Sequence, residues 1–235
     1  MEHEVTSAIL AAVVSLVISG GREVVDRRRQ FRQERRDAQV AYLRPLRNAC
    51  RELWLRLSDV DERVRDKKVT NADFIAFRDS ARRKDSDFVA ASNDYRTWHG
   101  STLYITARYF ACAAIFRSQL PLSAIPSDRN DELEKALDDV RAALGSGGPF
   151  GFWPDSQDAI GQAVAANGTV LTYRDFIQRL VEDHVSYTRL FDFYSGIEGK
   201  LDHQVKAARP ALGELLRHLE AVLNPKKRSG TRASP

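Results

Sequence analysis

Histidines are the side chains of this sequence best suited to acid–base chemistry or metal binding near neutral pH. They are widely separated, at His3, His99, His184, His203 and His218. None belongs to an HExxH motif or to the Cys/His spacing of a zinc site, and no phosphate-binding loop or GxSxG elbow occurs. His184 follows two acidic residues, but adjacent helical residues point to different faces. We therefore predict that it is a core histidine.

Arg108 is the other candidate for chemistry. It lies in the middle of residues 102–117, which are apolar on nearly every helical face. This setting predicts a buried guanidinium paired with a carboxylate, since an unpaired buried charge is strongly unfavourable. A site that joins Arg108, His184 and a tyrosine would make the chain an enzyme or a ligand sensor. Because no catalytic motif accompanies these residues, a non-enzymatic protein without a cofactor is the favoured interpretation.

The composition indicates an all-α fold. Gly and Pro are few (13 and 8 of 235 residues), which favours helices over a turn-rich β fold. Cys50 and Cys112 stand singly in apolar stretches, which predicts buried, reduced thiols and leaves a disulfide between them as the alternative. Hydrophobic periodicity predicts helices over 46–64, 102–117, 131–144, 156–166, 172–194 and 210–223.

Several boundaries follow from local signals. Asn71 is the expected N-cap of a short helix, and another helix is expected over Phe88–Tyr95. His99-Gly100 is expected to break the chain, with Ser101 capping the central helix. Pro45 should kink or restart the helix that reaches it. In the loop 145–154, we expect the aromatic residues Phe150, Phe152 and Trp153 to pack onto the core.

An uncharged apolar run covers seventeen residues, Val5–Gly21. As a helix it would rise about 25 Å, close to the lower limit for crossing a hydrocarbon core of about 30 Å. Glu2 and Glu4 precede it without any Lys or Arg, and arginines follow it, which places the N-terminus outside and the C-terminal body in the cytoplasm. We expect one N-terminal transmembrane helix. A buried soluble helix and an interfacial helix are the alternatives.

The apolar run also carries a ridge of small residues. Ser7, Ala11, Ser15 and Ser19 recur every four positions and share one helix face. Small side chains let two helices approach closely in lipid. The ridge predicts self-association of the chain as a parallel homodimer.

The segment after the run is rich in arginine. Residues 22–51 hold ten arginines and four acids, a local charge of +6. We expect Arg22, Arg27, Arg28 and Arg29 to contact anionic lipid headgroups, each at about 1 kcal/mol near the surface. Nucleic-acid binding is a weaker alternative, because no DNA- or RNA-binding motif accompanies the arginines.

Four segments result: a membrane anchor (1–21), a charged juxtamembrane helix (22–44), an irregular multi-helix cytoplasmic domain (45–224) and a disordered basic tail (225–235). The tail carries four positive charges, which equal the whole net charge of +4. The pI of 9.1 is therefore no sign of a basic domain.

Short motifs resemble those of a loose set of uncharacterised bacterial proteins. The segments concerned are STLY (101–104), RYFA (108–111) and QDAIG (157–161). The resemblance implies one N-terminal span and a helical cytoplasmic body, and it implies no activity. The absence of catalytic motifs, together with the anchor, predicts a membrane-tethered interaction or scaffold protein whose partners are the bilayer, a second copy and an unknown protein.

Overall fold

The computed structural model describes residues 27, 29–83, 95–120, 125, 127–145, 151–166, 168–196 and 201–224. These residues form an elongated helical bundle, and two short paired segments are the only β-strands among them. Within this part of the chain, no helix is both long enough and apolar enough to cross a bilayer. The predicted anchor 1–21, the expected helix over Phe88–Tyr95 and the basic tail 225–235 lie outside the described residues.

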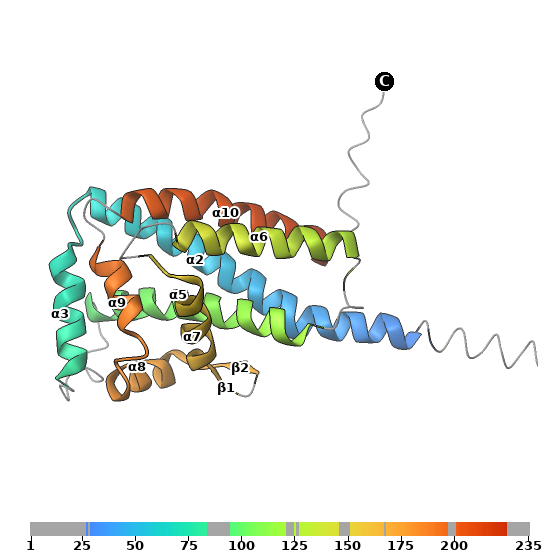
Figure 1. The fold of residues 1–235 in the computed structure, drawn as a ribbon, viewed down its shortest axis with the longest axis horizontal. Helices are drawn as coiled ribbons and strands as arrows, with labels where there is room; N and C mark the ends of the chain where they lie inside the picture. Colours follow the sequence, from blue (N-terminus) through green and yellow to red (C-terminus); the bar gives the residue numbers. More distant parts are fainter. Residues whose placement is uncertain are drawn as a thin grey trace, which may run out of the picture.

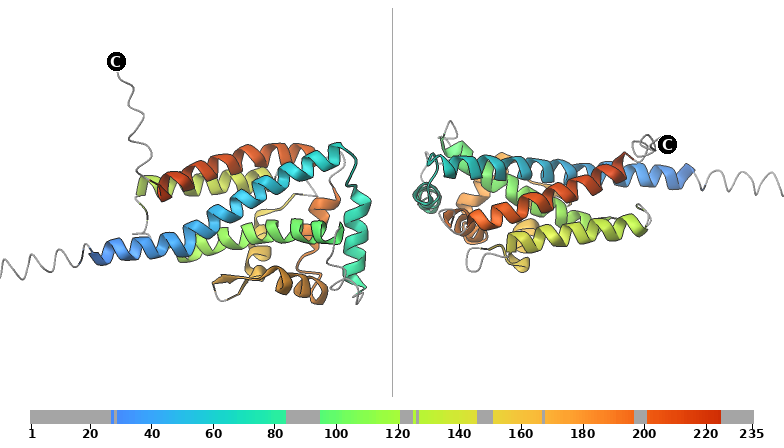
Figure 2. Two further views of the ribbon diagram at one scale, coloured as in Figure 1. Left: turned by 180° about the vertical axis from the view of Figure 1, so that it is seen from behind. Right: turned by 90° about the horizontal axis from the view of Figure 1, so that it is seen from above.

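One long helical segment enters the bundle from its N-terminal side. Residues 29–38 are helical and lead into a π-helical turn, η1 (Gln39–Leu43), and then into α2 (Arg44–Arg65). In this turn the Arg44 N–H donates to the Gln39 carbonyl. Pro45 has no N–H to donate, so the hydrogen-bond register changes at this point while the helix itself continues. The ribbon therefore runs unbroken from the projecting segment into α2 (Figure 2).

Long helices form the main layer of the bundle (Figure 1). α10 (Leu201–Leu223) packs against α6 (Ser127–Gly145) and α2, and α5 (Tyr95–Gln119) packs against α2. The predicted stripe of α2 is confirmed, since its apolar positions face the core and are fully or largely buried: Leu46, Cys50, Leu53, Leu57, Val60 and Val64. α5 is also the central helix that the sequence predicts.

Shorter elements cover the other side of α5. α7 (Pro154–Val164) leads into a hairpin of β1 (Ala165–Ala166) and β2 (Thr169–Val170), and α8 (Tyr173–Glu182) and α9 (Thr188–Ser195) follow. β1 and β2 are antiparallel, with Ala165 opposite Val170. α3 (Asn71–Arg82) crosses the far end of the bundle and packs against α9 (Figure 1).

The predicted start of the central helix was wrong. α5 continues through His99-Gly100 from Tyr95, and Ser101 is not its cap. A Cβ on Gly100 would lie 2.8 Å from the hydroxyl oxygen of Tyr173. The glycine therefore permits close packing between α5 and α8 and does not end a helix.

Other predicted boundaries also move. α10 begins at Leu201 and passes through Pro210, whose exposed position lets water solvate the carbonyl that loses its partner. The single helix expected over 172–194 is two helices, α8 and α9, joined by a turn at 184–187. The N-cap of α3 is Thr70, one residue before the expected Asn71, and its N–H donates to Asp73 Oδ2 at 2.7 Å.

The loop before α7 buries one aromatic ring. Phe152 is fully buried and stacks on Phe193, with a centroid distance of 4.1 Å. Trp153 is half-exposed, so the prediction that it packs onto the core was wrong. Phe150 lies outside the described residues. Cys50 and Cys112 are both buried and free, so the expected pair of reduced thiols is confirmed.

Candidate functional site

A half-open groove of about 540 Å³ lies over the middle of α5. Its floor is one face of that helix, because its four residues recur at helical spacing: Tyr104, Arg108, Cys112 and Ile115. One wall is the turn of η1 with the start of α2, and it contributes Ala41, Tyr42 and Pro45. The opposite wall is the continuous run 168–173, which comprises β2 and the start of α8.

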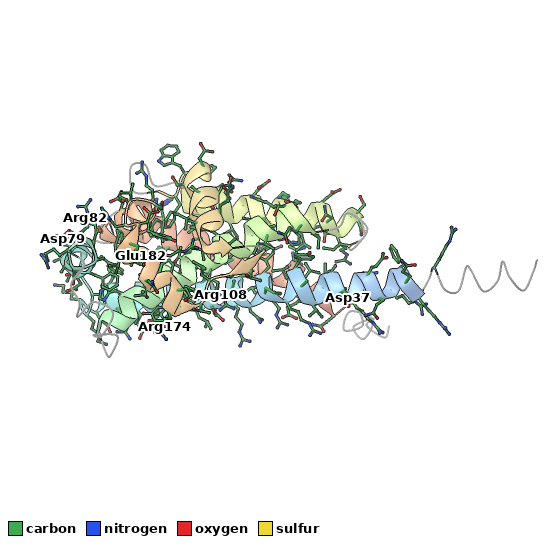
Figure 3. The ribbon with its side chains drawn as sticks, turned by 90° about the horizontal axis from the view of Figure 1, so that it is seen from below. Asp37, Asp79, Arg82, Arg108, Arg174 and Glu182 are labelled. Atoms are coloured by element: carbon green, nitrogen blue, oxygen red, sulfur yellow. The ribbon has the colours of Figure 1, made fainter. Side chains whose placement is uncertain are left out.

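Arg108 is the one charged side chain that lines this groove. Its Nη1 donates to Glu52 Oε2 on α2 at 2.6 Å, so the predicted pairing with a carboxylate is confirmed. The predicted burial was wrong, since 29% of the Arg108 side chain and 41% of the Glu52 side chain are exposed. Figure 3 shows Arg108 between Arg174 of α8 and Asp37 of the N-terminal helix.

The other polar side chains of the groove are hydroxyls and one thiol. Tyr104 donates its hydroxyl to the Leu171 carbonyl at 2.9 Å, which ties α5 to the run that follows the hairpin. Burial raises the pKa of Tyr104 and of Tyr173, and it raises the pKa of the Cys112 thiol to about 11. Cys112 is therefore a neutral thiol, a poor nucleophile in the folded protein.

The hairpin and the α8 cap hold the second wall in place. Leu171 N–H donates to the Val164 carbonyl at 3.0 Å, and Gly168 adopts a positive φ of 76° at the turn. Thr172 accepts a hydrogen bond from the Asp175 N–H at 3.2 Å and so caps the start of α8. These local bonds fix the main chain of 168–172 at the groove edge.

The structure does not bring His184 to Arg108. α8 ends at Glu182, and His184 begins the following turn, outside the set of residues that line the groove. The expected core position was also wrong, since His184 is only partly buried. His99 is the core histidine instead. It is 1% exposed and contacts the rings of Phe74 and Trp98, with centroids 4.6 and 5.2 Å away.

The residues proposed for the membrane lie mostly beyond the structure. The small-residue ridge Ser7, Ala11, Ser15 and Ser19 is outside the described residues, as are Arg22 and Arg28. Arg27 and Arg29 are described, and both are exposed on the projecting helix.

Most of the groove could not be predicted from the sequence. The spacing of Tyr104, Arg108, Cys112 and Ile115 places them on one face, and this signal was available. Tyr42 and the run 168–173 are distant in sequence from α5, and no local pattern joins them to it.

We compared the chain with family models, with curated proteins and with solved structures, and none of the three comparisons gave a match.

Proposed function

We propose that this chain is a membrane-tethered interaction protein, held by its N-terminal apolar run, with the helical body in the cytoplasm. The observation that carries the proposal is the long helical segment 29–65. At 1.5 Å per residue it spans about 55 Å. Its outer part, 29–37, is exposed apart from a half-buried Arg35, and its inner part forms core contacts from Ala38 onward. Such a segment would couple an anchor directly to the bundle.

Charge supports the same orientation. The exposed outer part carries Arg29, Arg32 and Arg36, and the other side of the apolar run has two acids and neither Lys nor Arg. Basic residues on the cytoplasmic side of a span determine its direction of insertion. Anionic headgroups would attract those of the three arginines that lie within a Debye length of the membrane surface.

Alkaline carbonate extraction tests the anchor. We expect the full chain to stay in the membrane pellet and to float with lipid in a density gradient, which separates insertion from aggregation. Leu10→Arg with Val14→Arg should release it, because each arginine near the centre of a span costs about 3 kcal/mol. The matched control is Gln30→Arg with Gln33→Arg, which adds the same charge to the exposed helix.

The control should stay with the membrane like the wild type. Carbonate extraction of the wild type, or retention of the Leu10/Val14 variant in the floating fraction, would show that the apolar run is not the anchor.

A further inference from the structure

The groove over α5 has a free main-chain edge as one wall. Val164 and Leu171 form a hydrogen-bonded pair through Leu171 N–H, and Ala165 lies opposite Val170. In an antiparallel ladder, hydrogen-bonded and non-hydrogen-bonded pairs alternate. The N–H and C=O of Val170 therefore point away from β1. β1 is the only strand paired with β2 in the described part of the chain.

Val170, which carries this free N–H and C=O, is one of the residues that line the groove. Residues 168–173 line it without interruption, although successive side chains of a strand point to opposite faces. A continuous run can line a groove when the main chain itself forms the wall. The wall therefore offers a backbone donor and acceptor at Val170, beside the apolar floor that Ile115 and the Tyr104 ring provide.

Arg108 adds a positive charge to this floor. Its ion pair with Glu52 uses Nη1, and it is the one ion pair of Arg108 among the described residues. A guanidinium has five N–H donors and can bind a second carboxylate along its other edge. Because 29% of the side chain is exposed, a ligand in the groove can reach it.

From these three features we propose that the groove binds a short extended peptide of a partner protein, with apolar side chains beside a carboxylate. The peptide would pair with the outer edge of β2 as an added strand, place alternate side chains on the apolar floor, and direct its carboxylate to Arg108. The volume of about 540 Å³ lies within the range of small-molecule pockets, so the groove has room for part of such a peptide. This inference rests on the proposed function, since it names the partner class of an interaction protein.

Fluorescence polarisation with the full chain in detergent tests the proposal. The probe is a fluorescein-labelled library of hexapeptides in which Val, Ile or Phe alternates with Glu or Thr. We expect saturable binding that favours Glu-containing members. Arg108→Gln should weaken it about tenfold or more and abolish that preference, because a charge-assisted contact is lost.

Val170→Pro tests the backbone edge. Proline removes the outward N–H of Val170, which forms no bond to β1, so the hairpin should remain intact while peptide affinity falls. The matched charge control is Arg117→Gln, which removes another partly exposed arginine of α5 that pairs with Asp138 and lies outside the groove. Its peptide affinity should equal that of the wild type.

The proposal is overturned if no peptide binds at concentrations up to about 1 mM. It is also overturned if the folded Arg108→Gln and Val170→Pro variants bind the peptides as tightly as the wild type does. A third contrary result is that the small aromatic carboxylate 3-phenylpropanoate binds in the groove and the peptides do not. The Leu10→Arg/Val14→Arg variant keeps the groove, so its peptide binding distinguishes a failed anchor from a failed peptide site.

Discussion

Gly161→Ala tests a close helix–helix approach in the bundle, that of α7 to α5. α7 packs its buried Gly161 against the backbone of α5, and a Cβ added there would lie 2.8 Å from the Phe110 carbonyl oxygen and 3.0 Å from its carbon. Backbone atoms cannot move aside as a flexible side chain does. The added methyl group must therefore push α7 away from α5.

The expected magnitude follows from two opposing effects. Alanine in a helix interior is favoured over glycine by about 1 kcal/mol. Overpacking in a core costs about 1–3 kcal/mol and occasionally more, and the contact with backbone places this site at the upper end. We expect the free energy of unfolding to fall by about 1–2 kcal/mol, which lowers Tm by about 2–8 °C in a domain of this size.

Gly213→Ala is the matched control. Gly213 is also helical, in α10, but the nearest atom to its added Cβ is Trp54 Nε1 at 3.9 Å, an ordinary contact. The same substitution should therefore stabilise the protein by about 0.5–1 kcal/mol. Thermal unfolding of the three full-length proteins, followed by far-UV circular dichroism in one buffer and detergent, measures the difference. If Gly161→Ala leaves Tm unchanged or raises it as Gly213→Ala does, the reasoning about the α5–α7 contact is refuted.

Two further predictions concern the core. Trp98→Phe should lower the free energy of unfolding by about 1–2 kcal/mol in urea titrations, because the indole N–H donates to Asp59 Oδ2 at 2.7 Å and phenylalanine cannot. Burial alone would raise the pKa of Asp59, but the hydrogen bonds from Trp98 and Arg63 lower it. The difference in unfolding free energy between the wild type and the variant should therefore shrink as the pH falls through the pKa of Asp59. If that difference stays the same at acidic pH, the prediction is contradicted. Burial raises the pKa of Cys112 from 9.0 to about 11 and that of Tyr194 from 10.0 to about 12, so the folded state holds these protons more tightly than the unfolded state. The contribution of these two groups to the free energy of unfolding should therefore be fully present below pH 9 and decrease as the pH rises towards 12. A urea midpoint that stays constant over that range would contradict the prediction.

The sequence alone determined the helical class and the strongest helices. The apolar stripe of α2 and the apolar faces of α5 were predicted to be buried, and they are. Such faces can be predicted because the spacing of apolar residues along one helix determines which face avoids water. The Thr172 cap was predictable for the same reason, since its partner Asp175 is three residues away.

Tertiary structure decided the rest. Gly100 is typical of a helix end when it is judged from the local sequence, yet α5 continues through it, and the Tyr173 side chain packs where a Cβ on residue 100 would lie. The apolar sequence around Arg108 predicts a buried charge, yet the groove between η1 and the hairpin leaves its side chain partly exposed to solvent. The first outcome depends on Tyr173, which is roughly seventy positions away in the sequence. The second depends on two groove walls that come from distant parts of the chain. The spacing of residues along one helix determines which face is apolar, but it does not determine which other segment packs against that face.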